Sequence, residues 1–289
     1  MPLSLGNSKA WATKPRLKGA GKAQGAGFER AQERRKIKNN LYKTLNFNKL
    51  YLSTKEREKM KSAIIYNGQS LLDNKPIVVI ATYSNRNTKT GKVVQTYILR
   101  EDINPLEASK TGEDYSICGD CPMRGEVTTD PERKQAKGRK CYVNLGQGPT
   151  IVYKSFIKGV YPKADFQWSR ILLGLDRFVR IGTYGDPAAV PNHVWEQLLS
   201  SATTWTAYTH QSNWRPDIAM QSADNHEQAI AQWKQGNRTF RVIADLGDID
   251  KKNEALCPAS KEAGRRVQCT ACKLCKGSSK GKSIAIVKH

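Results

Sequence analysis

The sequence predicts an α/β fold, either a TIM-barrel-like or an incomplete (β/α) barrel, with a C-terminal metal-binding loop and a basic N-terminal arm. Short apolar strands alternate with helical segments from about residue 150 onward, a pattern typical of a parallel sheet with right-handed crossovers. Three closely spaced cysteines come shortly before the last predicted strand. The first fifth of the chain is strongly basic, which sets it apart from the rest.

The basic arm comprises residues 1–63, and residues 64–289 are expected to form an α/β catalytic domain. The arm holds sixteen Lys or Arg and four Asp or Glu. The excess of basic over acidic residues in the arm is more than half of the formal net charge of +22. Because few large apolar residues occur in it, part of the arm is expected to be disordered. Such a charge favours nucleic acid, above all DNA, over an anionic membrane surface. Phosphate contacts are predicted for Arg34, Arg35, Lys36 and Lys38, with a solvated charged face as the alternative.

Ordered structure is predicted to begin near Lys75 with a hairpin of two strands, residues 76–83 and 93–99. Residues 151–158 form a short apolar segment. Asn192 is expected to cap the first helix of the second half. Further strands are predicted over residues 178–184, 206–209, 218–221, 239–244 and 283–287, and helices over residues 192–201 and 226–235.

The sequence has neither the apolar N-terminal run of a signal peptide nor a stretch near the roughly 20 apolar residues that span a bilayer. A cytoplasmic location without a membrane partner is therefore expected. The cytosol keeps thiols reduced, so the seven cysteines are not expected to form disulfides.

A metal-binding loop is predicted over residues 257–275. Cys269, Cys272 and Cys275 are separated by two residues each, and Cys257 or His289 would complete a tetrahedral site. Ligands of this kind suit zinc or, alternatively, a 4Fe–4S cluster. Unligated buried cysteines are the simpler alternative, because Cys also packs as a small apolar residue.

A looser group of cysteines occurs earlier in the chain and is a candidate for a second metal site. Cys118 and Cys121 are separated by two residues, and Cys141 follows after a polar stretch. Unligated cysteines are a stronger alternative here, because the spacing is less specific than in the C-terminal loop.

Polar residues follow several of the predicted strands. The carboxyl ends of parallel strands lie at one edge of a sheet, so these side chains are expected to converge there. Turn initiation, helix capping and core packing are the alternatives for individual members. The candidate catalytic residues are Asp186, His210 and Asp224, and the candidate substrate-binding residues are Tyr208, Ser222 and Asn225.

Residues 178–187, 205–211 and 257–275 together resemble a set of uncharacterised bacteriophage Cys-rich α/β proteins. This resemblance implies that the protein is located in the cytoplasm of the host cell. The chain also resembles the tRNA-guanine and deazaguanine DNA transglycosylases, which are barrels with a zinc site of three cysteines and a histidine. The set Cys269, Cys272, Cys275 and His289 is similar in ligand type and differs in spacing. This resemblance implies guanine base exchange on DNA, with a deazaguanine-type base as the incoming group. Asp186 would attack the sugar, and Asp224 would recognise the base or accept a proton.

A second resemblance is to the radical S-adenosylmethionine barrel enzymes, in which three cysteines hold a cluster and leave one iron open for S-adenosylmethionine. Cys118, Cys121 and Cys141 would be the three ligands, and residues 257–275 would hold an auxiliary cluster. The Cys-x-x-x-Cys-x-x-Cys motif of that superfamily is absent. The third hypothesis is a non-enzymatic bacteriophage nucleic-acid-binding protein.

Overall fold

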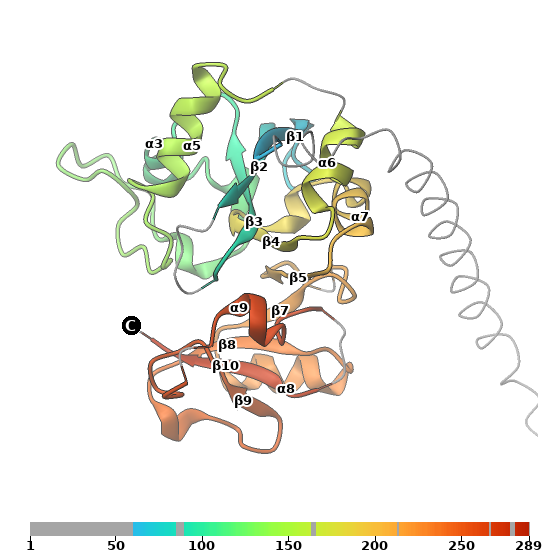
Figure 1. The fold of residues 1–289 in the computed structure, drawn as a ribbon. Helices are drawn as coiled ribbons and strands as arrows, with labels where there is room; N and C mark the ends of the chain where they lie inside the picture. The colour runs from blue at the N-terminus through green and yellow to red at the C-terminus, as the bar shows by residue number, and fades with distance from the viewer. Residues whose placement is uncertain are drawn as a thin grey trace, which may run out of the picture. The chain divides into compact units, whose positions relative to one another are not determined.

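The described part of the chain forms a mixed α/β fold with two five-stranded sheets (Figure 1). The structure, a computed structural model, describes residues 60–84, 90–162, 166–212, 214–265, 267–277 and 281–288. The chain divides into two units, Met1–Ser53 and Thr54–His289, and all described residues belong to the second. The predicted contacts of Arg34, Arg35, Lys36 and Lys38, and the predicted ligand His289, lie outside the described residues.

The first sheet combines antiparallel and parallel pairing. Its strands, in spatial order, are β1 (Ser62–Gln69), β2 (Pro76–Ser84), β3 (Val93–Arg100), β4 (Phe178–Tyr184) and β5 (Thr204–Thr206). The antiparallel pairing of β2 with β3 confirms the predicted hairpin. β1 also pairs antiparallel with β2, whereas β3, β4 and β5 are parallel. The prediction that order begins near Lys75 is wrong, because β1 already includes Ser62 and Ala63 from the end of the predicted arm.

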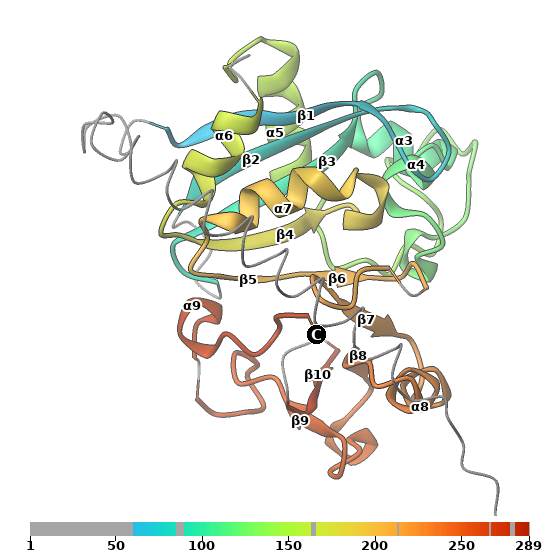
Figure 2. The ribbon, with the colours of Figure 1, turned by 90° about the vertical axis from the view of Figure 1, so that its right-hand side faces the viewer.

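Helices cover both faces of the first sheet, which explains why the centre of β2 and all of β3 are buried. In Figures 1 and 2, α6 and α7 lie on one face of β1–β4, and α3 and α5 lie on the other. The expected apolar segment at residues 151–158 is part of a helix, and Pro191 rather than Asn192 occupies the N-cap of α7. The helices are α3 (Pro105–Thr111), α4 (Tyr115–Cys118), α5 (Gly148–Ile157), α6 (Phe166–Gly174) and α7 (Asn192–Ser200).

The second sheet is parallel throughout. Its strands, in spatial order, are β6 (Tyr208–Thr209), β7 (Met220–Ala223), β8 (Thr239–Ile243), β10 (Ser283–Val287) and β9 (Glu254–Leu256). Helix α8 (His226–Lys234) packs against β7 and β8, and the one-turn helix α9 (Cys269–Cys272) precedes β10. Between β8 and β9 lies the 3-10 turn η3 (Leu246–Asp248).

The two sheets meet at Ala207, a single residue between β5 and β6 whose carbonyl accepts a hydrogen bond from the amide of Met220. The strand predicted over residues 206–209 is therefore split between the sheets. The strand predicted over residues 218–221 is shifted two residues along the chain, because Ile218 and Ala219 bond back to Arg215 in a turn. No closed barrel is found among the described strands. From β3 onward the paired strands of each sheet are parallel, so their carboxyl ends lie at one edge of that sheet.

Candidate functional site

Asp186 joins the carboxyl ends of β4 and β6, which belong to different sheets. It follows β4 and the tightly packed Gly185, and its carboxylate accepts hydrogen bonds from the Thr209 hydroxyl at 2.8 Å and the His210 amide at 2.8 Å. A third bond, from the Ala188 amide at 3.0 Å, caps the 3-10 turn η2 (Pro187–Ala189). Burial raises the pKa of Asp186, while these three donors act in the opposite direction. The buried carboxylate therefore positions the end of β6, which carries His210.

His210 stands between a thiol and a carboxylate. Its Nε2 atom lies 3.9 Å from the Cys121 sulfur and 3.4 Å from a carboxylate oxygen of Asp224. Burial alone would lower the pKa of His210, but the hydrogen bonds with Asp224 and Cys121 raise it to about 10. The structure thus brings together two of the predicted catalytic residues, His210 and Asp224. It adds Cys121, which belongs to the N-terminal group of cysteines, Cys118, Cys121 and Cys141, called the first group below.

The three cysteines of the first group lie in one half-buried environment. Cys118 ends α4, Cys121 precedes the 3-10 turn η1 (Pro122–Arg124), and Cys141 returns to that turn through a 3.0 Å bond to the Met123 carbonyl. Burial raises the pKa of Cys118 well above its usual value, and the neighbouring charges of Asp114, Cys121 and Cys141 raise it further.

Two arginines hold the backbone around these thiols. Arg124 donates to the Asp114 carboxylate at 2.7 Å and to the Gly119 carbonyl at 3.1 Å, which fixes the turn between Cys118 and Cys121. Arg139 donates to the carbonyl of Cys141 at 3.0 Å. A hydrogen bond from a charged arginine is stronger than one from a neutral donor. These arginine bonds to main-chain carbonyls therefore hold the two loops firmly.

The Gln211 side chain approaches the same turn from the end of β6. Its amide nitrogen donates to the Cys118 carbonyl at 3.4 Å, and its own backbone amide donates to Thr209 at 3.0 Å. Gly119 has a φ of 54°, and a Cβ there would lie 2.4 Å from the Gln211 amide nitrogen. Only glycine combines this backbone conformation with such a close approach.

Tyr184 places an unsatisfied hydroxyl beside the thiols. It is the last residue of β4, is 3% exposed, and its hydroxyl has no hydrogen-bond partner among the described residues. Burial raises its pKa well above the usual value, and the charge of Cys118 adds to this effect. A buried hydroxyl without an acceptor is costly, so a bound group that offered an acceptor here would be stabilised by Tyr184.

The three predicted substrate-binding residues do not lie with His210 and the first group of cysteines. Asn225 caps α8 by accepting a 2.8 Å bond from the Gln228 amide, which is the alternative role expected for it. Ser222 lies within β7 instead of following it. Tyr208 packs its ring 4.4 Å from that of Phe240, near the second group of cysteines.

The sequence selects the cysteines, His210 and Asp224 as candidates, and it does not select Tyr184, Arg124 and Arg139, which the structure places near them. Tyr184 ends a predicted strand, so the rule that selected Asp186 could also have selected it. No sequence pattern marks the two arginines, because their role is to hold carbonyls of the folded loop.

Among the described residues, no group of three or more His, Cys, Asp or Glu side chains is already arranged to hold a metal ion. No described helix is long and apolar enough to cross a membrane. No family model matches the chain, and no match was found among curated proteins or solved structures.

Proposed function

We propose that this protein is an iron–sulfur enzyme whose cluster is held by Cys118, Cys121 and Cys141, and that it acts on nucleic acid. The observation that carries the proposal is the contact of Cys121 with His210, just after the carboxyl end of β6, together with the bond by which Gln211 holds the turn between Cys118 and Cys121 at the same place. Active sites of parallel α/β folds lie at this edge. The parallel series from β3 to β10 is proposed to be an incomplete (β/α) barrel around it.

The donor set fits an iron–sulfur cluster. Thiolates are the usual ligands of such clusters, and three of them leave one iron without a protein thiolate. The Tyr184 hydroxyl has no acceptor among the described residues, and a cluster sulfur would supply one. Ligation would require the three thiols to approach one another more closely than they do here. Arg124 and Arg139 hold the backbone next to these thiols through the carbonyls of Gly119 and Cys141.

The resemblance to radical S-adenosylmethionine enzymes gives the open iron its proposed role. When bound, such a cluster supplies one-electron chemistry on S-adenosylmethionine. His210 stands beside Cys121, Asp224 contacts His210, and both side chains can hold or move a proton at the site. Asp186 keeps His210 in place through its amide.

Base exchange by attack of Asp186 on a sugar is less well supported by this geometry. The Asp186 side chain is 6% exposed and accepts three hydrogen bonds, so its oxygens are occupied in positioning β6. A nucleophile has to present a free oxygen to its substrate. The nucleic-acid substrate itself is proposed on the net charge of +22 alone.

Anaerobic purification tests the proposal. We expect a brown protein whose iron and sulfide fall when Cys118, Cys121 and Cys141 are all replaced by Ala, and whose electron paramagnetic resonance spectrum changes when S-adenosylmethionine is added. Lys140→Gln is a matched control, since its exposed side chain neighbours Cys141 and the variant keeps all three thiols. A colourless protein that holds zinc at these cysteines, with His210 as the fourth ligand, would overturn the proposal.

A further inference from the structure

The loop that leads from η1 to α5 carries a dense run of positive charge. Residues 133–140 contain five Lys or Arg and no Asp or Glu. Two of the five are occupied, because Arg133 pairs with Asp130 at 3.4 Å and Arg139 donates to two main-chain carbonyls. The other three have exposed side chains without an ion-pair partner among the described residues. These three are Lys134, Lys137 and Lys140.

Main-chain hydrogen bonds hold this loop in one shape, although it projects beyond α3 (light green in Figure 1). Glu126 and Lys137 form an antiparallel bridge with bonds of 2.8 Å and 2.9 Å. The Lys140 amide donates to the Met123 carbonyl at 3.1 Å, and Ala136, between the lysines, is buried. The charges are therefore presented on an ordered backbone, which lowers the entropy cost of binding a charged partner.

An exposed aromatic ring follows the lysines directly. Tyr142 is 72% exposed, whereas tyrosine side chains are more often half-buried. Its hydroxyl accepts a 2.7 Å hydrogen bond from Arg180 of β4, whose guanidinium carbon lies 6.0 Å from the ring centroid. This bond fixes the hydroxyl end of the ring and leaves most of its surface accessible. A planar partner can therefore stack on Tyr142, two residues after Lys140.

Lysines beside an exposed aromatic ring match the chemistry of a nucleic-acid strand. Lysines bind phosphates as point charges, and bases stack on exposed aromatic side chains. The bases of a duplex are stacked on one another, so a stacking ring favours a single strand, whose bases can be splayed out. An anionic membrane would also attract the lysines, but residues 133–142 expose no aliphatic side chain that could insert into it.

We infer that residues 133–142 form a binding surface for single-stranded nucleic acid, with Lys134, Lys137 and Lys140 on its phosphates and a base stacked on Tyr142. The inference rests on the proposed function in one respect, that nucleic acid is the substrate, and it names the surface that holds the strand. Cys141 lies between the last lysine and the stacking ring, so this surface adjoins the proposed cluster ligands along the chain. Binding of the strand does not require the cluster itself.

Fluorescence anisotropy with the whole chain tests the inference. The probes are a fluorescein-labelled oligothymidylate of about 20 nucleotides and a duplex of the same length, and we expect the single strand to bind more tightly. Tyr142→Ala should weaken binding of the strand about 5- to 150-fold, the effect of losing one stacked base. This loss should persist at high salt, because stacking does not depend on the phosphate charge. Tyr142→Phe should retain most of the affinity, because the ring remains.

The salt dependence of binding tests the lysines. If each of the three contacts one phosphate, Lys134→Gln/Lys137→Gln/Lys140→Gln should make the slope of log affinity against log salt shallower by about 2. An oligouridylate of the same length, titrated in parallel, shows whether the strand is DNA or RNA. Binding of either strand through this loop supports the inference.

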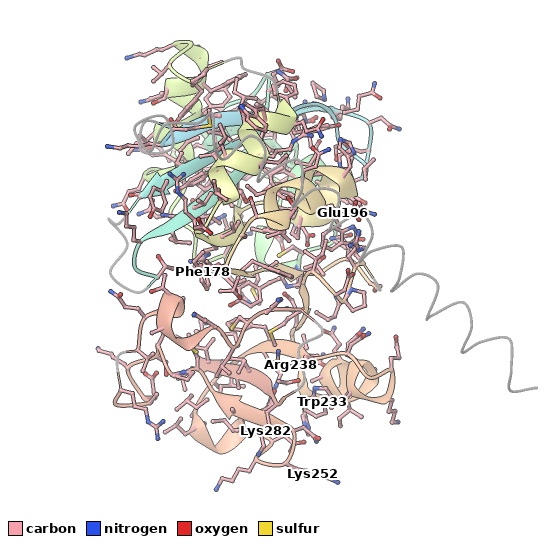
Figure 3. The ribbon with its side chains drawn as sticks, turned by 45° about the vertical axis from the view of Figure 1, so that its right-hand side comes forward. Phe178, Glu196, Trp233, Arg238, Lys252 and Lys282 are labelled. Carbon is pink, nitrogen blue, oxygen red and sulfur yellow. The ribbon has the colours of Figure 1, made fainter. Side chains whose placement is uncertain are left out.

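The matched control removes the same charge from exposed positions elsewhere. Lys234→Gln/Lys251→Gln/Lys252→Gln changes lysines that follow α8 or lie between β8 and β9, where Figure 3 labels Lys252. This variant should leave the slope unchanged. A difference between the two triple variants therefore separates contacts of the loop from the general attraction of a net charge of +22.

The outcomes distinguish this inference from the proposed function. Equal effects of the two triple variants, or full affinity in Tyr142→Ala, would overturn the inference, while strand binding elsewhere would leave the proposed function standing. A wild-type protein that binds neither strand nor duplex, or that binds only anionic phospholipid vesicles, would overturn the inference and the nucleic-acid substrate together. Iron is counted in the same samples after anaerobic reconstitution with iron and sulfide. A protein that binds the strand through this loop but holds no iron would overturn the cluster alone.

Discussion

The backbone amide of His210 donates a 2.8 Å hydrogen bond to the buried carboxylate of Asp186, and this bond joins the end of β6 to the end of β4. The two strands belong to different sheets, so the bond helps to hold the sheets together at the edge where the thiols gather. Its removal should affect folding as well as the site.

Asp186→Ala is expected to lower the free energy of unfolding by about 2–4 kcal/mol, because it leaves a buried hydroxyl and two amides without their acceptor. Urea denaturation measures the loss. Asp120→Ala, at an exposed carboxylate, is the control and should cost less than about 1 kcal/mol. Equal losses in the two variants would contradict the positioning role of Asp186.

Glu254→Gln is expected to destabilise the second sheet strongly. Arg241 donates to Glu254 at 2.9 Å and 2.6 Å, and the two side chains are only 6% and 0% exposed. The substitution leaves a buried guanidinium without its counter-charge, which costs about 3–5 kcal/mol. Asp130→Asn, at an exposed pair with Arg133, should change stability by less than about 1 kcal/mol. Chemical denaturation of both variants makes the comparison.

Tyr184→Phe should separate folding from cluster binding. In the metal-free protein it removes a hydroxyl that has no partner among the described residues, so stability should be unchanged or slightly higher. In the reconstituted protein it removes a proposed hydrogen bond to the cluster, so the reduction potential should change. A destabilised metal-free variant with an unchanged potential would refute this assignment.

Arg124→Gln is expected to reduce the iron bound at the first group of cysteines. The variant loses the bonds that fix the turn between Cys118 and Cys121. Arg133→Gln, in an exposed pair on the same connecting loop, is the control and should retain its iron. Iron analysis after reconstitution, with circular dichroism to confirm folding, gives the result. An unchanged iron content in Arg124→Gln would contradict this role of the Arg124 hydrogen bonds.

Much of the strand pattern could be predicted, because β-branched runs mark β2, β3 and β4 directly. β1 was missed because it begins immediately after a highly charged segment, and its pairing partners decide its conformation. β7 was misplaced because the apolar pair Ile218 and Ala219 is buried in a turn, and apolar content alone does not distinguish a turn from a strand.

The candidate site was only partly predictable for a related reason. Strand-end position selected Asp186 and His210 correctly as neighbours, since the fold brings both to one edge. Whether a carboxylate there is free or occupied depends on donors that approach from other strands, such as Thr209. The contact of Cys121 with His210 joins positions 89 residues apart, and no local pattern specifies it.

Arg180 donates a 2.7 Å hydrogen bond to the hydroxyl of Tyr142, the residue that follows Cys141. The same guanidinium interacts electrostatically with Cys269. Arg180 therefore links the loop that carries Cys141 to the segment that carries Cys269, although these stretches lie far apart in the sequence.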